Sequence, residues 1–295
     1  MSRLDLTVRV ERAPQTLLAL ISEAVGDRDR AMALITRGAA FVGGRRAKQP
    51  QQSLAAGTRV VLHVEDRGPE LAEAALEPRV IFEDEAVIVL DKRPGEHLNE
   101  TETSVVLSLV ERLRARIPEV RVVHRLDRET SGVVILAKTL GEAERLSAAF
   151  REREVEKRYV ALVEGAIADQ LIEAKIAPDR RRPRARRVLD SGQAAATRVT
   201  TLAVAHGLSA VSAVPITGRT HQIRVHLAHA GAPILGDRLY GGPLAVRVEG
   251  ELMKLGRTLL HARELIVPLA GGTRRFEAPV PEDLARFATL GLPVE

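Results

Sequence analysis

The chain has 295 residues, of which 45% are hydrophobic and 28% are charged, a balance that suits one or two globular domains with a sizeable core. It contains no cysteine, so disulfides, thiolate nucleophiles and cysteine-ligated metal sites are excluded. The net charge of +5 favours a polyanionic partner only weakly, and all of the excess lies in residues 1–64, where ten basic residues face five acidic ones.

The first 64 residues are predicted to form a small domain of two helices and several short strands, because apolar residues first recur at helical spacing and then alternate. The predicted elements are a helix over 15–24, a helix over 30–37, a turn at Gly43-Gly44 and a strand over 59–64. Residues 65–79, rich in acidic residues and containing two prolines, are predicted to be a linker.

Residues 80–295 are predicted to form the larger domain. The expected elements are strands over 80–90 around the acidic turn 83–85, a helix over 105–116, a strand over 133–137, a helix over 142–151, a strand over 159–164, strands within 172–216, a helix over 220–230 and a strand over 259–267. Strands and helices are interleaved without regular alternation. This favours an α+β fold with a mixed, largely antiparallel sheet.

Two stretches bear on where the protein resides. The first 14 residues alternate polar and apolar side chains and lack an apolar core, so they do not resemble a signal peptide. The stretch from Val199 to Gly218 has no charged side chain, but its Thr, Ser, Gly and Pro residues indicate paired strands with a turn and not a membrane span. We therefore expect a cytoplasmic protein with no membrane contact.

The segment from Val122 to Thr139 has the strongest chemical content. Its pattern predicts a short apolar stretch, then a polar loop with the sequence HRLDRETSG, then a buried strand. This places Asp127 on a loop held by rigid structure, where catalytic groups are commonly found. Taken alone, the pattern also fits a surface turn in which Asp127 forms ion pairs with Arg125 or Arg128.

The same loop resembles the signature of the RluA-type RNA pseudouridine synthases. Three further blocks match that family in order: EKRYVALVEG at 156–165, TGRTHQIRVHLAHAGAPILGDRLYG at 217–241 and LLHARELIVP at 259–268. The N-terminal unit is similar to the alpha-L RNA-binding domain that many members carry. The resemblance implies the pseudouridine synthase fold over residues 80–295, a small alpha-L domain over 1–64, and isomerase activity on RNA.

The resemblance also implies roles for individual residues. Asp127 would attack or deprotonate the target nucleotide, Tyr159 would stack on the flipped uracil and Arg224 would pair with the Asp127 carboxylate. The remaining residues expected to contact RNA or the flipped base are Arg125, which would enter the space left by the base, Leu260, which would pack beneath it, and His124, Arg219 and His221.

Several of these residues have other readings on sequence grounds. Tyr159 begins an apolar strand and could be a core ring. Arg224 follows Thr220, a possible helix N-cap, by four residues, and most helical arginines are simply solvated. His124 fits a hydrogen-bonding residue that organises the loop better than a catalyst.

No cofactor or metal is expected. Converting uridine to pseudouridine breaks an N-glycosidic bond and rebuilds it to carbon without redox change, and the sequence contains neither GxGxxG nor GxxxxGK[ST]. The histidines at 221, 226 and 229 could suggest a metal site. They lack a placed acidic partner, and the spacing from His221 to His226 is poor for shared ligation, so we predict none.

The run from Arg180 to Arg187 contains six arginines in eight residues and is predicted to be a hairpin loop that lies on phosphates. A flexible, solvated loop is the alternative. Arginine is abundant throughout the chain, and a GC-rich codon bias would explain part of that abundance.

Three departures from the family pattern are visible. After the strand that precedes the catalytic block, the order Lys92-Arg93-Pro94-Gly95 replaces the usual Lys-Pro, small residue, Gly, so the geometry of that loop is uncertain from sequence. The N-terminal unit has Ala13-Pro14-Gln15-Thr16-Leu17 in place of the usual Arg-Leu-Asp opening, and Gly43-Gly44 where Asn-Gly is common. Both changes predict weaker RNA binding by that unit.

The sequence therefore predicts a monomeric pseudouridine synthase that modifies uridines in structured RNA, with ribosomal RNA as the first expectation and transfer RNA as the second. Whether Asp127 adds to uracil C6 or to the sugar C1′ stays open. Two other classes are considered: a non-catalytic RNA-binding or ribosome-assembly factor on the same scaffold, and a hydrolase with Asp127 as a covalent nucleophile. The hydrolase lacks a placed base or nucleophile elbow.

Overall fold

The computed structural model describes residues 2–7, 14–64, 77–99 and 108–294. Most of the predicted linker and the start of the predicted helix over 105–116 lie outside these residues. The contacts divide the chain into one unit of residues 1–77 with 99–112 and a second unit of residues 78–98 with 113–295. This grouping differs from the predicted one for residues 99–112, and the predicted boundaries at 64 and 80 stay a prediction.

The two helices of the first unit begin at polar caps. The hydroxyl of Thr16 accepts a hydrogen bond from the Ala19 amide before α1 (Leu17–Val25), and Asp27 caps α2 (Arg28–Thr36) in the same way. Gly26, with φ of +72°, ends α1. Both helices were predicted, and both are confirmed.

A small antiparallel sheet completes the first unit. Its strand order is β1-β6-β3-β4, with a separate pair β2-β5. The bounds are β1 (Ser2–Thr7), β2 (Gln15–Thr16), β3 (Ala40–Val42), β4 (Arg45–Ala47), β5 (Ser53–Leu54) and β6 (Arg59–Val64). Gly43 and Gly44 join β3 to β4 with φ of +55° and +80°, a turn that favours glycine at both positions. The assignment to the alpha-L family stays a prediction.

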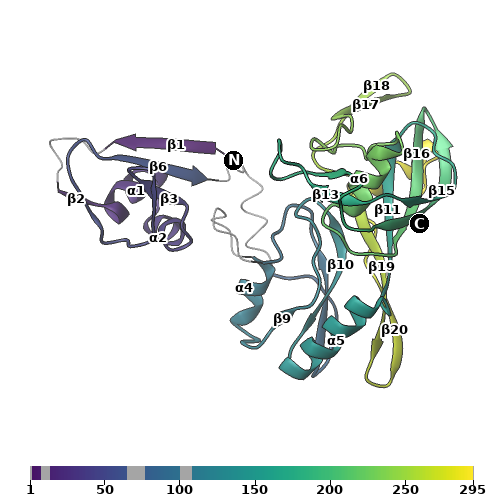
Figure 1. Cartoon of the computed structure of the whole chain (residues 1–295), viewed down its shortest axis with the longest axis horizontal. Coiled ribbons are helices and arrows are strands. Elements are labelled where there is room, and N and C mark those ends of the chain that lie inside the picture. The colour runs from purple at the N-terminus through teal and green to yellow at the C-terminus, as the bar shows by residue number, and fades with distance from the viewer. Residues whose placement is uncertain (1, 8–13, 65–76, 100–107, 295) are drawn as a thin grey trace. The chain divides into compact units, whose positions relative to one another are not determined.

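The second unit is built on one ten-stranded sheet within the described residues (Figure 1). The order is β12-β15-β16-β11-β19-β10-β8-β7, with β20 paired to β19 and β9 paired to β10. The bounds are β7 (Val80–Glu83), β8 (Val87–Lys92), β9 (Arg121–Val122), β10 (Ser131–Ala137), β11 (Glu156–Glu164), β12 (Gln170–Glu173), β15 (Ala196–Ala205), β16 (Leu208–Pro215), β19 (Leu260–Leu269) and β20 (Gly272–Glu277). The predicted α+β fold with a largely antiparallel sheet is confirmed.

The parallel contact in this sheet joins β10 to β19. It is short, pairing Ser131 with His261 and Gly132 with Ala262. Gly132 has φ of +114°, and a Cβ there would lie 2.2 Å from the carbonyl oxygen of Ala262. Glycine is therefore required where the two strands meet. The meeting brings the loop before β10 beside the start of β19.

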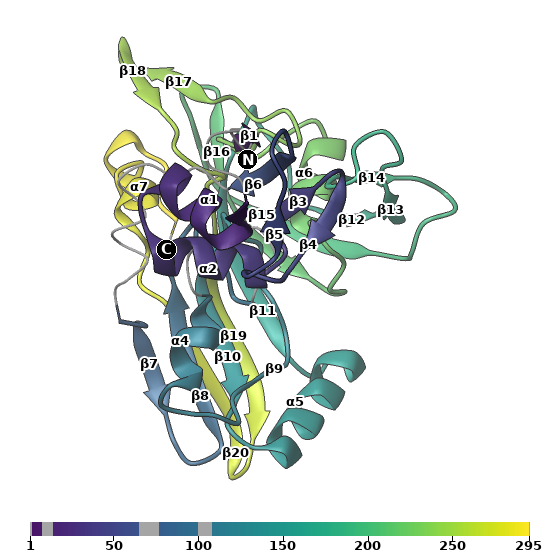
Figure 2. The same cartoon turned by 90° about the vertical axis from the view of Figure 1, so that its left-hand side faces the viewer.

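Two apolar cores stabilise the sheet on either side of this meeting point. One packs α5 (Leu140–Glu152) against β10 and the C-terminal part of β19, as both views show (Figures 1 and 2). The other joins β11 and β16 to the C-terminal elements α7 (Glu282–Ala285) and η2 (Ala288–Leu290). The short helix α4 (Leu109–Arg114) lies within the predicted helix over 105–116.

The helix α6 (Gln222–His229) packs against β14 (Arg186–Val188), β15 and β16, and it starts differently from the prediction. Thr220 is not its N-cap, so that prediction is wrong. His221 occupies the cap position with φ of +59° and makes no side-chain cap. The side-chain oxygen of Gln222 instead accepts from the Arg219 amide at 3.0 Å and from the Thr217 hydroxyl at 2.5 Å, which holds the turn before the helix.

The arginine run joins two strands of a hairpin, as predicted. The strands β13 (Ile176–Pro178) and β14 (Arg186–Val188) are antiparallel. A second hairpin joins β17 (Ala245–Val248) to β18 (Glu251–Lys254). It projects from the second unit near β16 in both views (Figures 1 and 2). Among the residues that the structure describes, no helix is long and apolar enough to cross a membrane.

Two histidines, the buried His261 and the half-buried His124, should make stability depend on pH. Burial lowers the pKa of His124 to about 3 and that of His261 to about 4, from 6.5. Both therefore stay neutral in the fold at pH 5 while the unfolded chain binds a proton at each, so stability falls as pH drops below about 6.5. Each histidine should lower the free energy of unfolding by about 2 kcal/mol when the pH falls from 7 to 5.

Urea unfolding followed by circular dichroism checks this expectation. Gln at 124 can still accept the Ile135 amide hydrogen bond that His124 Nε2 accepts at 3.0 Å, and Asn at 261 can still bond the Ser131 hydroxyl, which lies 2.9 Å from His261 Nδ1. Neither replacement titrates. Each variant should lose about 2 kcal/mol less than the wild type over this range. Equal losses in all three proteins would contradict it.

Candidate active site

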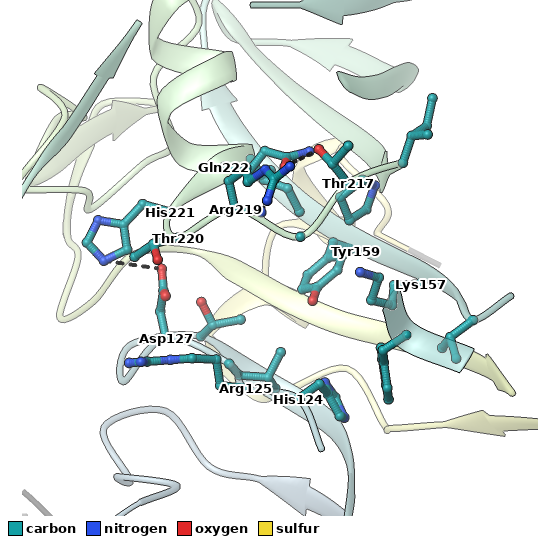
Figure 3. A pocket seen from close by; sticks show the side chains of 18 of the residues that line it. His124, Arg125, Asp127, Lys157, Tyr159, Thr217, Arg219, Thr220, His221 and Gln222 are labelled. Atoms are coloured by element: carbon teal, nitrogen blue, oxygen red, sulfur yellow. Dashed lines mark hydrogen bonds and ion pairs between the residues drawn. The ribbon is translucent and has the colours of Figure 1, made fainter. Parts of the chain in front are cut away.

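A cavity of about 530 Å³ opens in the second unit beside the β10–β19 meeting point. Four parts of the chain line it: the loop before β10, the end of α5 with the start of β11, the turn leading into α6, and Leu260 at the start of β19. All eight side chains predicted as site residues line this cavity. Figure 3 labels six of them: His124, Arg125, Asp127, Tyr159, Arg219 and His221.

The loop that carries Asp127 is held by hydrogen bonds to its backbone from the segment at the end of β8. Lys92, fully buried at the end of β8, donates from Nζ to the carbonyl of Arg128 at 2.9 Å and to that of Arg93 at 2.9 Å. The Gly95 amide donates to the same Arg128 carbonyl at 2.7 Å. The segment after Lys92 departs from the family pattern, yet it supports the loop through these hydrogen bonds.

Burial lowers the pKa of Lys92 to about 7, although the charge of Glu96 opposes the shift. From the other side, Arg257 Nη1 donates to the Glu129 carbonyl at 3.2 Å, and its guanidinium pairs with Asp283 of α7 at 2.5 and 2.8 Å. The loop is therefore fixed both to the end of β8 and to the segment before β19. Such support keeps a catalytic side chain in place.

Asp127 faces an arginine that is itself held by a buried carboxylate. Arg224 Nη1 donates to Asp127 Oδ2 at 3.1 Å. The other side of the same guanidinium forms a two-point pair with Asp237, from Nε to Oδ2 at 2.7 Å and from Nη2 to Oδ1 at 2.8 Å. Asp237 is completely buried, whereas the Asp127 side chain is 19% exposed. Arg224 thus presents one fixed donor to Asp127.

Arg224 stays protonated and positively charged at this position. Burial alone would lower its pKa, but hydrogen bonds and charge from Asp237, with a further contribution from Asp127, raise it above its usual value. The arginine is buried and paired, so the reading as a solvated helical residue does not apply. The surface-turn reading of Asp127 with Arg125 or Arg128 does not apply either, since Arg224 is the partner and Arg128 pairs with Glu129.

Tyr159 and Leu260 form the apolar part of the cavity. Tyr159 is 9% exposed on β11, opposite Ala262 of β19, and Leu260 is 3% exposed. Figure 3 places the Tyr159 ring between Asp127 and Lys157. Burial, and to a lesser degree the charge of Asp127, raise the pKa of Tyr159. The ring therefore stays neutral, and it is both packed and open to the cavity.

The remaining predicted residues take different places around the cavity. His124 stacks on Phe150 at 4.5 Å, and its Nε2 accepts from the Ile135 amide, which fits a loop-organising role. Arg125 is exposed. Arg219 donates to the Ala194 carbonyl at 3.2 Å. His221 Nε2 lies 3.8 Å from Asp127 Oδ2 (Figure 3).

Three residues of the site were not predicted. Asp237 holds Arg224, Tyr240 contacts His221 through its hydroxyl at 2.7 Å, and Lys157 lines the cavity two residues before Tyr159. Burial lowers the pKa of Lys157. The first two lie inside the family block over 217–241, which was the available signal, and the two-residue spacing on one strand was the signal for Lys157.

The predicted absence of a metal stays a prediction. Within the described ranges, no group of three or more His, Asp or Glu residues could hold a metal ion. His226 is bound instead to the Thr197 hydroxyl at 2.9 Å and to the Ala174 carbonyl at 3.0 Å. The side chain of His226 is therefore used in structural contacts.

Comparison with known proteins identifies the family. Residues 86–229 match the model of the RNA pseudouridylate synthases. The chain is 35% identical over 278 residues to a ribosomal large subunit pseudouridine synthase D of Xanthomonas campestris, covering 88% of this chain and 83% of that protein. The chain belongs to the RluA-type RNA pseudouridine synthase family.

Two other relatives of this pseudouridine synthase agree. The chain is 36% identical over 211 residues to the dual-specificity RNA pseudouridine synthase RluA of Escherichia coli, covering 68% of this chain and 92% of that protein. The solved structure of human RNA pseudouridylate synthase domain containing 1 aligns with a TM-score of 0.60 at 28% identity, over 74% of this chain and 89% of that one. The predicted family and enzyme class, an isomerase, are confirmed.

The match to the pseudouridine synthases also locates the site within the family's shared region. Asp127, Tyr159 and Arg224 lie inside residues 86–229, while Asp237 and Leu260 lie beyond them. The individual roles of these residues in this synthase stay predictions.

Proposed function

We propose that this pseudouridine synthase modifies uridines in structured ribosomal RNA, with Asp127 as the catalytic carboxylate. The observation that carries the proposal is the pairing of a partly exposed Asp127 with Arg224 in a cavity next to Tyr159. Support for ribosomal RNA comes from the relative in Xanthomonas campestris, which is named for the large ribosomal subunit. The predicted cytoplasmic location and monomeric state stay predictions.

The cavity suits a base that has left its stack. Flipping a nucleotide costs a few kcal/mol, which stacking in a pocket and a side chain in the vacated space can offset. Tyr159 offers a ring face, Leu260 an apolar contact beneath, and Arg125 an exposed guanidinium near Asp127. These are the surroundings that a flipped uracil needs.

The reaction then needs one negatively charged group and no added reagent. The bond between uracil N1 and the sugar C1′ breaks, and a bond between uracil C5 and C1′ forms. The proton on C5 is lost and N1 gains one, so atoms balance without a cofactor. The Asp127 carboxylate can serve as nucleophile or base in these steps, and Arg224 Nη1 holds one of its oxygens by a charge-assisted hydrogen bond.

The rim of the cavity and the arginine hairpin supply charge for the phosphate backbone. Arg151, Arg153 and Lys157 are among the residues that line the cavity. In the hairpin, Arg180 and Arg181 are exposed. A row of cations of this kind binds RNA in a salt-dependent way. We propose that the hairpin contacts phosphates next to the target uridine.

Mapping of pseudouridine in RNA tests the proposal. Total RNA from cells that lack this protein is incubated with the purified full chain, treated with carbodiimide and read by primer extension. We expect a new stop at one or a few uridines of large-subunit ribosomal RNA. New stops only in transfer RNA would overturn the ribosomal target. RNA binding with no product would instead support the non-catalytic factor.

A further inference from the structure

Tyr240 connects the arginine hairpin to the active site through one hydroxyl group. Its Oη accepts a hydrogen bond from the backbone amide of Arg186, on β14, at 2.9 Å, and it lies 2.7 Å from Nδ1 of His221. A second contact joins the same parts, since Arg182 Nη1 donates to the Leu239 carbonyl at 3.1 Å. The hairpin and the segment that carries Asp237 and Tyr240 are therefore packed together.

The hydrogen bond to Tyr240 sets the proton position on His221. A neutral imidazole has one donor and one acceptor nitrogen, and its partners decide which is which. Because Oη already accepts from the Arg186 amide, its own O–H is paired only if it donates to His221 Nδ1. The imidazole proton then sits on Nε2, which faces Asp127 Oδ2 at 3.8 Å.

Two donors thus face the same oxygen of Asp127. Arg224 Nη1 bonds Oδ2 at 3.1 Å, and His221 Nε2 lies 3.8 Å from the same oxygen, the contact that Figure 3 marks with a dashed line. Within the part of the chain that the structure describes, Oδ1 has no hydrogen-bond partner. This arrangement holds one oxygen and leaves the other to react.

The Tyr240 ring contacts both of these donors. The Arg224 guanidinium carbon lies 5.0 Å from its centroid, and the His221 ring meets it edge-on at 5.7 Å and 80°. His221 also has a backbone φ of +59°, a conformation that costs a non-glycine residue on the order of 1 kcal/mol or more. Such strain is retained where the surrounding structure requires the side chain in that place.

We propose that Tyr240 and His221 are positioning residues for catalysis: Tyr240 orients the His221 imidazole, whose Nε2–H holds Asp127 Oδ2 together with Arg224 so that Oδ1 faces the nucleotide. The inference rests on the proposed function of Asp127. It also connects the hairpin to the reacting carboxylate through the Arg186 amide.

Steady-state kinetics on the mapped RNA, measured as release of tritium from C5 of uridine, tests the proposal. Tyr240→Phe keeps the ring on Arg224 and removes only the hydroxyl. We expect a fall in kcat of about tenfold, the effect of one hydrogen bond, with KM for RNA unchanged. His221→Asn tolerates positive φ but is too short to reach Asp127, and should lower kcat similarly.

Two further variants separate positioning from a merely structural role. His221→Gln can still offer an N–H to Asp127 and should recover part of the lost kcat. Combining Tyr240→Phe with His221→Asn should cost no more than His221→Asn alone, since Tyr240 acts through His221. His206→Asn is the matched control, because His206 also has positive φ, 54°, but is exposed in the β15–β16 turn.

The outcomes distinguish this inference from the proposed function. An inactive wild type on every RNA would overturn the function itself. An active wild type with full kcat in Tyr240→Phe, or with effects that multiply in the double variant, would overturn the positioning role alone. Thermal unfolding of each variant checks that loss of kcat does not follow loss of fold.

Discussion

Replacing Asp127 with Asn should reduce the rate of pseudouridine formation by on the order of 10³-fold or more while leaving RNA binding intact. Asn has the same shape and can accept the hydrogen bond from Arg224 Nη1, which spans 3.1 Å in the wild type. It has no negative charge, so it can act neither as a nucleophile nor as a base. The loss should therefore appear in kcat and not in KM.

Stability should change little in the same variant. The Asp127 side chain is 19% exposed, and Arg224 keeps its two-point pair with Asp237 when the charge at 127 is removed. We expect a change in unfolding free energy within about 1 kcal/mol. A large loss of activity with little loss of stability is the behaviour of a functional group and not of a structural one.

Asp190→Asn is the matched control. It makes the same chemical change at an exposed position outside the cavity. Tritium release measures the rate for both variants, and filter retention measures RNA binding. If Asp127→Asn kept more than about a tenth of the wild-type kcat, a contribution of general-base size would be missing and another group would have to carry the reaction.

The sequence contained much of the fold because its patterns are local. The strand over 133–137 and the helix over 142–151 follow from a continuous apolar run and from helical spacing, and both formed as β10 and α5. The turn at Gly43-Gly44 follows from the freedom of glycine at positive φ. Such features depend on neighbouring residues and are readable one segment at a time.

The start of α6 shows where local reading failed. Thr220 has the chemistry of an N-cap, but the cap position lies one residue later, at His221, which has a positive φ, and the helix begins at Gln222. The competing contacts come from Gln222, whose Nε2 donates to the Ala196 carbonyl at 2.9 Å on another strand. A tertiary contact overrode the local capping preference, and no pattern in the segment itself contains that contact.

The same distinction applies to the site. Asp127 and Arg224 could be paired in advance only through the family resemblance, because 97 residues separate them. Asp237 was missed although it lies 13 residues after Arg224. A buried carboxylate that satisfies an arginine has no sequence signature of its own, since its identity follows from the packing around it.

Asp237→Asn should be the most destabilising single change in the site. Asp237 is fully buried and bonds Arg224 through both oxygens, and its Oδ1 also accepts from the amides of Leu239 and Tyr240 at 3.0 and 3.3 Å. Asn removes the charge and leaves a buried guanidinium only partly compensated. The expected loss is roughly 3–5 kcal/mol in urea unfolding. Activity of the folded fraction should also fall, because Arg224 loses the support that aims Nη1 at Asp127.

Asp283→Asn separates burial from the pairing itself. Asp283 also holds an arginine at two points, Arg257 at 2.5 and 2.8 Å, but its side chain is 35% exposed where that of Asp237 is fully buried. Arg257 is itself buried, but water reaches residue 283, and Arg257 Nη1 keeps its hydrogen bonds to the carbonyls of Glu129, Thr258 and Leu260. The loss at 283 should therefore be smaller, about 1 kcal/mol. Equal losses at the two positions would mean that burial is not what makes the Arg224 pair matter. A smaller loss at 237 would show that Asp127 alone can compensate Arg224, and the buried carboxylate would then serve only to direct the guanidinium.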